Sequence, residues 1–476
     1  MVNILGANSV SGGYEIDNSL RFNDNDSARL TFTPSGAGNR RTFTLSVWFK
    51  LQSNTTTERV LLAADDGTGG NNNFDYIAVK QTSQILVYGY TGSENQQLIS
   101  TQALRDPSAW YHLVVAFDTT QATAANRIKV YLNGSQVTDF ATANYPSENF
   151  QTKINNANAH RIGSYPDQDV SYFDGYMSEY HVIDGAAKAS SDFGEFDNNG
   201  VWVPKEYTGD YGTNGFYLEF KETGTSANSS GIGADTSGND HHWAVTNLAA
   251  IDVVVDTPTN NFATANPLSG FGEADIKEGN CLLDAGGDIG APSTIGFSSG
   301  KWYMEMKSTI TAGHGNRKVV GIYSTDDPLN NPRASDGASD NAYPFTGVIV
   351  NLRTGVAVTS GVDGNATDVG AFANNDICSL AYDGDNGLLY IYKNGTILNS
   401  GNALNASNAL DTSKLYLFYL NQDGGSSNNG ELFLNFGNPS FAVSSGNADA
   451  NGYGNFEYAV PSGYYSLCTK NLAEFG

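Results

Sequence analysis

The chain has 476 residues, a length that suggests two or three domains. Only 16% of them are charged, which excludes a disordered chain or a coiled coil, since both need far more charge. The net charge of −25 disfavours nucleic acid and anionic membranes as partners. Abundant Tyr and Phe, with few Lys, Glu and Met, favour an all-β protein.

Neither an export signal nor a membrane span is expected. Met1–Gly6 has no basic segment followed by an apolar one. No stretch approaches the roughly 20 apolar residues that cross a bilayer. The three cysteines, Cys281, Cys378 and Cys468, are predicted to be buried free thiols, with one disulfide and a spare thiol as the alternative.

From Leu20 to Ile183 the chain consists of short apolar segments separated by Gly, Asn and Asp turns, a spacing typical of a β-sandwich. Strands are predicted over Thr42–Lys50, Tyr111–Asp118, Ile128–Leu132 and Gly175–Ile183. In the first of these strands every second residue is a large apolar one, which predicts one buried face.

Residues 206–264 are rich in Gly, Ser, Thr, Asn and Asp, which predicts a loop-rich connector. A short helix is expected just before it, over Ala186–Phe196. Within the connector, Gly215–Phe220 is expected to be a strand that pairs with one or the other neighbouring domain. From Gly272 the strand pattern resumes and continues to the C-terminus.

A diverged repeat links the two halves. Ile128–Gly134 (Ile-Lys-Val-Tyr-Leu-Asn-Gly) aligns with Leu389–Gly395 (Leu-Tyr-Ile-Tyr-Lys-Asn-Gly), and upstream Ala116–Asp118 aligns with Ala381–Asp383. Both copies end in Asn-Gly, a strong hairpin signal. Two matches in the same order predict that both halves share a hairpin, and with it a topology.

Known families share these motifs. In the first half, the segments Ala109–Asp118, Val130–Gly134 and Phe173–Glu179 resemble LamG-type concanavalin-A-like domains. The second half resembles a SPRY domain in the segments Gly300–Glu305, Val320–Tyr323, Asp376–Asp383, Tyr392–Gly395 and Leu434–Pro439. The resemblance implies an all-β fold of two tandem concanavalin-A-like jelly-roll β-sandwiches. The expected parts are an N-terminal arm (1–19), a LamG-like sandwich (20–205), the connector (206–264) and a SPRY-like sandwich (265–476).

With the segments Val255–Asn261 and Leu467–Leu472, this order of modules resembles tailed-phage virion proteins. The resemblance implies a non-enzymatic virion structural protein, such as a fibre, spike or capsid decoration, that leaves the host cytoplasm by lysis. It would contact other virion proteins through Met1–Asn18 and host-surface polysaccharide through its loops, with self-association expected in such an array. The alternatives are a secreted carbohydrate-binding or glycan-degrading protein, a SPRY-type peptide-binding adaptor, and an acidic cytoplasmic protein.

No catalytic residues are expected. Glu273, Asp275 and Glu278 match the E-x-D-x-x-E spacing of some glycanases, but they run into the Gly279-Asn280 turn, which favours solvated turn carboxylates. The six histidines form no motif that carries chemistry and are predicted to be structural or surface residues.

Calcium would need six to eight oxygen ligands. The acids in the candidate loops are Asp65, Asp66, Asp167, Asp169 and Asp174, with solvated loop acids as the favoured alternative. No other cofactor is expected.

Glycan binding has a physical basis, because aromatic rings stack on the apolar faces of sugars while amides and carboxylates bind their hydroxyl groups. Loops that combine these groups contain the candidates Tyr165, Asp167, Tyr172, Tyr343 and Phe345. At each position the alternative is an aromatic ring that caps the end of a sheet.

Overall fold

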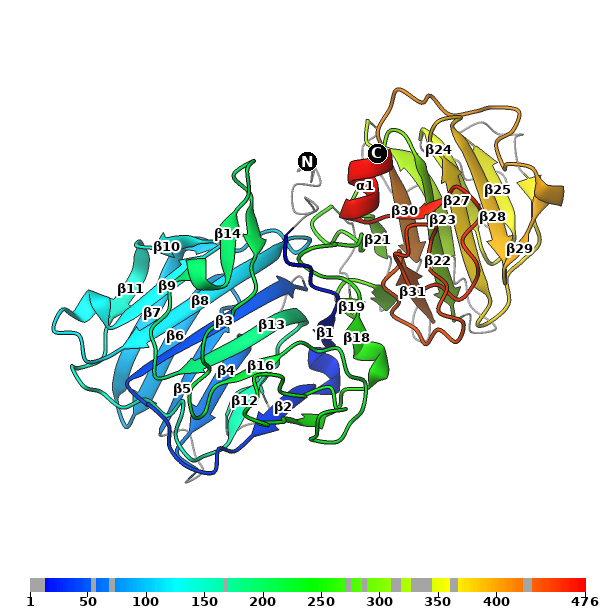
Figure 1. The fold of residues 1–476 in the computed structure, drawn as a ribbon. Coiled ribbons are helices and arrows are strands. Elements are labelled where there is room, and N and C mark those ends of the chain that lie inside the picture. The colour runs from blue at the N-terminus through cyan, green and yellow to red at the C-terminus, as the bar shows by residue number, and fades with distance from the viewer. Residues whose placement is uncertain are drawn as a thin grey trace. The chain divides into compact units, whose positions relative to one another are not determined.

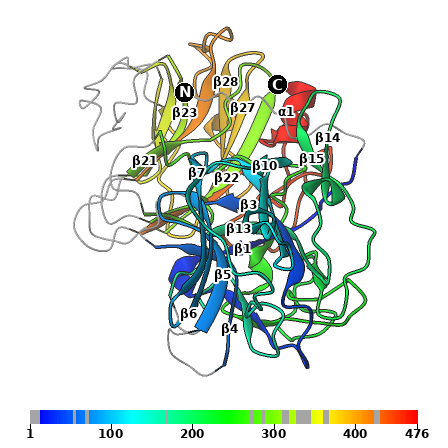
Figure 2. The same ribbon diagram turned by 90° about the vertical axis from the view of Figure 1, so that its left-hand side faces the viewer.

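The computed structural model describes residues 13–52, 57–67, 73–166, 170–269, 275–284, 289–309, 318–326, 345–359, 367–422 and 430–476. The chain divides into two compact units. One is Val10–Thr259, and the other contains Asn260–Gly476. Each unit is built around two large, mainly antiparallel sheets (Figure 1, Figure 2), so the fold is the predicted pair of tandem jelly-roll sandwiches. We call them the N-terminal and the C-terminal sandwich.

The N-terminal sandwich has two large sheets. The first contains, in spatial order, β10 (Ser135–Val137), β9 (Ile128–Leu132), β8 (Trp110–Asp118), β3 (Thr42–Leu51), β13 (Gly175–Asp184), β1 (Ser19–Phe22) and β18 (Val253–Val254), with β16 (Phe216–Leu218) also paired to β13. The second contains β11 (Phe140–Asn144), β7 (Glu94–Ala103), β6 (Gln84–Thr91), β5 (Asn73–Val79), β4 (Arg59–Asp65), β12 (His160–Ile162), β2 (Arg29–Phe32) and β17 (Ala244–Thr246).

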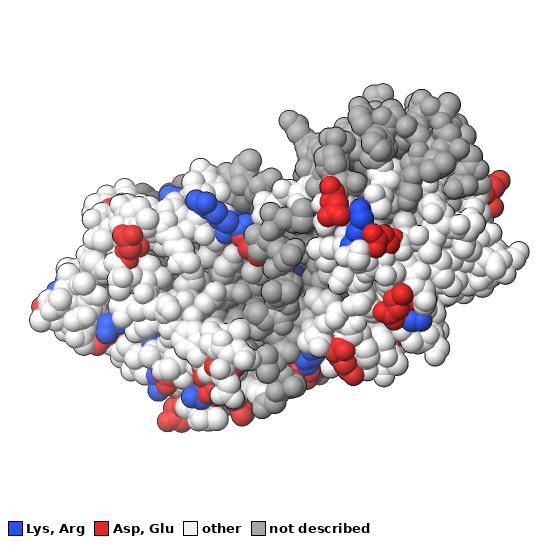
Figure 3. All heavy atoms as spheres, turned by 90° about the horizontal axis from the view of Figure 1, so that it is seen from above, with Lys and Arg blue, Asp and Glu red and all other residues white. Residues whose placement is uncertain are grey.

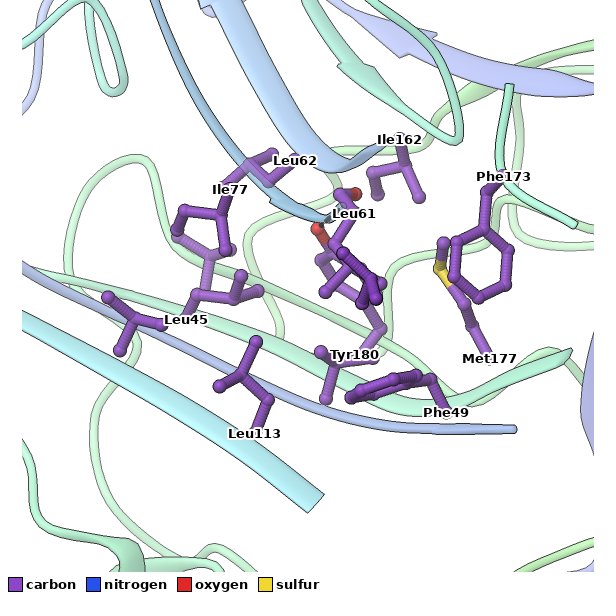
Figure 4. Close-up of a cluster of buried hydrophobic side chains, with 14 of the residues drawn as sticks. Leu45, Phe49, Leu61, Leu62, Ile77, Leu113, Ile162, Phe173, Met177 and Tyr180 are labelled. Carbon is purple, nitrogen blue, oxygen red and sulfur yellow. Dashed lines mark hydrogen bonds between the residues drawn. The ribbon is translucent and has the colours of Figure 1, made fainter. Parts of the chain in front are cut away.

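The core lies between these two sheets (Figure 4). Leu45 and Phe49 of β3 lie in this core together with Leu62 of β4 and Ile77 of β5, and all four side chains are buried. Each large apolar side chain buried in this way contributes on the order of 1.5–3 kcal/mol. The Tyr180 hydroxyl donates a hydrogen bond to the Leu61 carbonyl at 3.0 Å, which ties the two sheets together.

The predicted strands of this half are confirmed with shifts of at most one residue at either end. The expected helix over Ala186–Phe196 is wrong. A 3-10 helix (Ser190–Asp192) is followed by the hairpin of β14 (Gly194–Phe196) and β15 (Trp202–Pro204). Gly194 packs directly against the Trp202 ring, where a Cβ atom would come within 2.4 Å of a ring carbon. The glycine is therefore needed for the hairpin to pack this closely, and glycine also disfavours a helix.

Segments outside the expected boundaries also belong to the N-terminal sandwich. The segment predicted as a connector contributes β16, β17 and β18 to its sheets, because Phe216, Leu218 and Trp243 bury their side chains in its core. The described end of the expected arm packs against it as well. Tyr14 and Ile16 lie in a cluster with Trp48, Trp110, Tyr176, Trp202 and Val254.

The C-terminal sandwich is built in the same way. Its first sheet contains β19 (Asp275–Lys277), β20 (Leu282–Asp284), β31 (Glu431–Asn435), β22 (Lys301–Ser308), β27 (Ile377–Asp383), β28 (Leu388–Lys393) and β29 (Thr396–Ile397), with β32 (Tyr465–Ser466) parallel to β22. The second contains β21 (Ile289–Pro292), β30 (Tyr416–Gln422), β23 (Lys318–Ser324), β24 (Gly347–Asn351), β25 (Val356–Thr359) and β26 (Thr367–Asp368).

Helices contribute little to the described part of the chain. One α-helix, α1 (Thr469–Phe475), follows β32. Four 3-10 helices besides Ser190–Asp192 span Asp24–Asp26, Ala124–Asn126, Ala250–Asp252 and Asn399–Gly401. Among the described residues no helix is long and apolar enough to cross a membrane.

The internal repeat is confirmed at the level of strand register. Phe117 pairs with Ile128 in the N-terminal sandwich, and Tyr382 pairs with Leu389 in the C-terminal one. These are the positions that the sequence repeat aligns. In both copies the second strand turns at Asn-Gly, with both turn residues at positive φ, into a short third strand.

Candidate functional site

Aromatic side chains gather on the outer face of the second sheet of the N-terminal sandwich. On β5, Ile77 and Val79 face the core, so Phe74 and Tyr76 point outward. On β6 the alternation likewise directs Tyr88 and Tyr90 outward. Tyr165, from the loop after β12, packs onto the same surface. We call these five residues (Phe74, Tyr76, Tyr88, Tyr90 and Tyr165) the tyrosine face.

Strand pairing sets the spacing of these rings. Tyr76 lies opposite Tyr88, and Phe74 lies opposite Tyr90. The ring centroids of these two pairs are 5.5 and 5.9 Å apart. Tyr165 completes the group, with its ring 5.1 Å from Phe74 and 5.4 Å from Tyr76. Phe74 and Tyr76 are buried beneath their neighbours, whereas Tyr88, Tyr90 and Tyr165 are half-buried and present part of each ring to solvent.

Polar side chains flank the rings along the same rows of the sheet. Arg161 and Tyr76 lie on opposite sides of Ala63, and Gln97 lies opposite Tyr88. The Tyr76 hydroxyl donates to Glu58 Oε2 at 2.8 Å, and Arg161 Nη1 donates to the Tyr165 carbonyl at 3.1 Å. Burial, and after it the charge of Glu94, raises the pKa of Tyr88, which keeps its hydroxyl protonated at neutral pH.

This arrangement suits a ligand with apolar faces and hydroxyl groups. Partly exposed rings, fixed by cross-strand packing, offer flat apolar surfaces with little side-chain entropy left to lose. The Gln97 amide and the Tyr88 hydroxyl beside them both donate and accept hydrogen bonds. Figure 3 shows one face of the whole molecule, on which Lys, Arg, Asp and Glu are scattered among uncharged residues.

The predicted glycan-binding residues occupy different places. Tyr165 lies on the tyrosine face. Tyr172 is only 8% exposed, and its hydroxyl accepts a hydrogen bond from Arg29 Nη1 at 3.4 Å. Phe345, also 8% exposed, packs with Val319, Tyr323, Ile349, Val358 and Tyr419 on the second sheet of the C-terminal sandwich. Asp167 and Tyr343 lie outside the described residues.

The predicted calcium ligands are described only in part. Asp65 Oδ1 accepts a hydrogen bond from the Gly67 amide at 2.8 Å, and Asp66 follows it at the end of β4. Asp174 is buried. It lies near Arg59, whose pKa is lowered to about 10 by burial, and the negative charge of Asp174 partly offsets that lowering. Asp167 and Asp169 lie outside the described residues. Within the described ranges no three His, Cys, Asp or Glu side chains are placed to hold a metal ion. Calcium binding stays a prediction.

The described acids of the glycanase-like spacing belong to the C-terminal sandwich and not to the tyrosine face. Glu278 lies in the turn between β19 and β20 of the C-terminal sandwich, as the sequence predicts, and Asp275 is in β19. Glu273 lies outside the described residues.

Buried histidines have structural partners. His112 stacks on Trp48 and accepts a hydrogen bond from Trp202 Nε1 at 3.0 Å, and burial lowers its pKa to about 3. Burial likewise lowers the pKa of His160 to about 4. His181 lies 3.3 Å from Glu179, which also accepts the Tyr217 hydroxyl at 2.5 Å.

Four aromatic residues of the tyrosine face were not among the predicted site residues. A signal for them exists in the sequence, since Phe74-Asp-Tyr76 and Tyr88-Gly-Tyr90 each place aromatics at alternate positions of a strand. The sequence does not reveal the strand register that places these two pairs of aromatic residues side by side.

Comparison with known proteins agrees with this architecture. Residues 23–191 match the Laminin_G_3 family model, described as the concanavalin A-like lectin/glucanases superfamily. The match lies within the N-terminal sandwich, which is therefore concanavalin-A-like, as the sequence predicted. No curated protein matches the chain.

Several solved structures resemble parts of the chain. The SPRY domain of human HERC1 is 16% identical, with a TM-score of 0.28, and the match covers 36% of this chain and 96% of that domain. A heptameric SAP-like pentraxin from Limulus polyphemus is 17% identical, with a TM-score of 0.28, and the match covers 36% of this chain and 78% of the pentraxin chain. Domain 4 of AbnA, an extracellular arabinanase of Geobacillus stearothermophilus solved with arabinotriose, is 16% identical, with a TM-score of 0.24 and coverage of 33% and 67%.

Proposed function

We propose that this chain is a non-enzymatic glycan-binding protein that holds uncharged polysaccharide on the tyrosine face. The observation that carries the proposal is the packing of Tyr88, Tyr90 and Tyr165 around Phe74 and Tyr76, which leaves part of three rings open on a rigid sheet. The family match over residues 23–191, to a superfamily described by its lectins and glucanases, supports the same ligand class.

A binding role without turnover is supported by the position of the acids. Cleavage by a retaining glycosidase needs two carboxyl groups about 5 Å apart at the bound sugar. The one string with glycanase-like spacing belongs to the C-terminal sandwich, and its last acid, Glu278, lies in a turn. Of the acids beside the tyrosine face, Glu58 accepts the Tyr76 hydroxyl and Glu94 accepts the Asn144 amide at 2.7 Å.

We further propose that the protein acts on the surface of a phage particle, as a fibre, spike or capsid decoration. This part rests on the resemblance of the module order to tailed-phage virion proteins. Many copies on one particle would convert weak individual sites into firm attachment. Mass spectrometry of purified particles tests it, since a virion component is present at a fixed ratio to the capsid protein. A protein found only in the particle-free fraction would instead be the secreted alternative.

The glycan proposal is tested on an array of uncharged and acidic polysaccharides probed with the full chain. We expect binding to a subset of the uncharged glycans, lost in the Tyr88→Ala variant and kept in a variant of an exposed residue away from the face, Thr120→Ala. Binding to no glycan, or binding that Tyr88→Ala leaves unchanged for every glycan bound, would refute the tyrosine face as the site.

A further inference from the structure

A second group of tyrosines lies on the C-terminal sandwich, on the outer face of its first sheet. Leu389 and Ile391 of β28 point into the core, which directs Tyr390 and Tyr392 outward. The segment between β31 and β32 packs on this face, where Tyr464 joins the same cluster as Tyr390 and Tyr392, and Tyr458 lies against Gly395 of the hairpin turn. All four rings are half-buried. We call Tyr390, Tyr392, Tyr458 and Tyr464 the C-terminal tyrosine patch.

The segment between β31 and β32 is fixed to the sheet by a buried carboxylate. Glu305 on β22 is fully buried and accepts hydrogen bonds from the backbone amides of Glu457 and Tyr458, both at 2.8 Å. Beside it, Phe456 packs edge-on against Tyr303. Tyr458 in turn lies against the hairpin turn, so close that a Cβ on Gly395 would come within 2.6 Å of its ring.

Tyr464 is held from the other side. It directly precedes β32, which pairs with β22 at Trp302 and Tyr303. Lys301 Nζ lies 5.9 Å from the centre of its ring. The patch is therefore a preorganised surface whose rings lose little further entropy when a ligand binds.

The chemistry of the patch is that of a neutral amphipathic surface. None of the four hydroxyls makes a hydrogen bond to another described residue, so each is available to donate and to accept. The charges around the rings are already engaged. Lys301 pairs with Asp383 at 2.8 Å, Lys393 pairs with Asp376 at 2.9 Å, and Glu457 accepts hydrogen bonds from Ser444 at 2.6 Å.

We propose that the C-terminal tyrosine patch is a second binding site for uncharged oligosaccharide. The rings present apolar faces, the hydroxyls match those of a sugar, and the paired rim charges offer nothing specific to an ionic ligand. A peptide fits less well, because β28 is paired with β27 along one edge and with β29 at Tyr392 and Lys393 along the other, which uses the backbone groups that strand addition needs. This site stands on its own residues and does not require the tyrosine face to bind.

The test compares three forms of the full chain on arrays of uncharged oligosaccharides and of peptides. The variants are Tyr392→Ala with Tyr458→Ala, Tyr88→Ala alone, and the control Thr396→Ala on the same hairpin. The double variant should bind some uncharged oligosaccharides at least about tenfold more weakly, while Thr396→Ala and Tyr88→Ala keep that binding. Thermal unfolding of the double variant checks that the fold is intact.

A readout on the unaltered protein guards against a folding defect. Hydroxyl-radical footprinting, with the tightest-binding oligosaccharide among those that Tyr88→Ala still binds, should reduce oxidation of Tyr392 and Tyr458. Oligosaccharide binding that the double variant retains, with no protection of these tyrosines, overturns the second site and leaves the tyrosine face standing. If Tyr88→Ala changes nothing while the double variant loses binding, the second site holds and the first proposal fails. Loss of peptide rather than oligosaccharide binding overturns the ligand class.

Discussion

Asn133 and Asn394 make the same two hydrogen bonds in the two sandwiches. The backbone amide of each donates to a strand carbonyl, that of His112 or of Ile377, at 2.9 Å. Each side-chain Oδ1 then accepts the backbone N–H of that same residue at 2.8 Å. Both asparagines are at positive φ, at 45° and 48°, so each closes its hairpin in a conformation that Asn tolerates better than most residues.

We expect Asn133→Ala and Asn394→Ala each to destabilise their own sandwich by about 2 kcal/mol. The substitution removes one side-chain hydrogen bond, worth about 1 kcal/mol, and adds about 1 kcal/mol of backbone strain. Asn→Gly at the same positions restores the backbone freedom and should recover part of the loss. Urea unfolding measures both variants. Equal stability of the Ala and Gly variants would show that the left-handed backbone conformation contributes nothing to the loss of stability.

The N-terminal sandwich should lose stability as pH rises from 4 to 7. Burial raises the pKa of Asp75 to about 7, against the opposing effects of the Lys153 amide and the charges of Lys153 and Arg40. The unfolded chain releases this proton near pH 4, so between the two pKa values unfolding becomes easier by up to about 1.4 kcal/mol per pH unit.

The Asp75→Asn variant isolates this effect, because Asn carries no ionisable group and, like the protonated acid, keeps one carbonyl oxygen to accept from either Gln96 or the Lys153 amide. We expect it to match the wild type at pH 4 and to be more stable at pH 8. Tryptophan fluorescence in urea reports mainly on this sandwich, since four of the five tryptophans, Trp48, Trp110, Trp202 and Trp243, lie in it. The control is Asp210→Asn, a substitution of an exposed acid, which should leave the pH dependence of the unfolding free energy unchanged. Parallel pH curves for Asp75→Asn and the wild type would contradict the assignment.

Lys50 and Asp256 form an ion pair that tests whether the segment 206–259 is part of the N-terminal sandwich. Lys50 Nζ lies 2.8 Å from Asp256 Oδ2 with both side chains fully buried, and Trp110 Nε1 donates to the other carboxylate oxygen at 3.1 Å. Asp256→Ala leaves a buried ammonium group without its counter-charge and should cost about 3–5 kcal/mol. The exposed Glu206→Ala in the same segment should cost less than about 0.5 kcal/mol. Similar melting curves for the two variants would argue for a loose connector.

The three cysteines should be unreactive in the folded protein. All are free and fully buried, and burial raises the pKa of Cys468 to about 11. Little thiolate is then present at neutral pH. Ellman's reagent should label none of them under native conditions and all three in urea without reductant. Labelling of a single thiol in urea would reveal a disulfide.

Strand patterns were predictable because the signal is local. Alternating apolar residues located β3, β8, β9 and β13, and the Asn-Gly repeat located the shared hairpin. Gly215–Phe220 was predicted as a strand, and its residues Phe216–Leu218 form β16. The rest of segment 206–264 was interpreted as a connector because its composition is that of a loop. Phe216, Leu218 and Trp243 are nevertheless buried in the core of the N-terminal sandwich. Their burial depends on partners far away in the sequence, such as β13 and β2, which composition does not reveal.

The candidate site shows the same limit. Tyr165 was found because it stands in a loop among polar residues, whereas Phe74, Tyr76, Tyr88 and Tyr90 read as ordinary strand aromatics. The pairing of β5 with β6, and the loop that lays Tyr165 over them, make them one surface.

The central claim is that Tyr88 presents its ring to a sugar. Calorimetric titration tests it most directly, with the tightest-binding glycan among those that the variant with Tyr392→Ala and Tyr458→Ala still binds. Tyr88→Phe keeps the ring and should bind within a few-fold of the wild type, whereas Tyr88→Ala should weaken binding by at least about tenfold, or about 1.4 kcal/mol, with an unchanged melting temperature. Equal affinity of the wild type and the Ala variant would contradict the account.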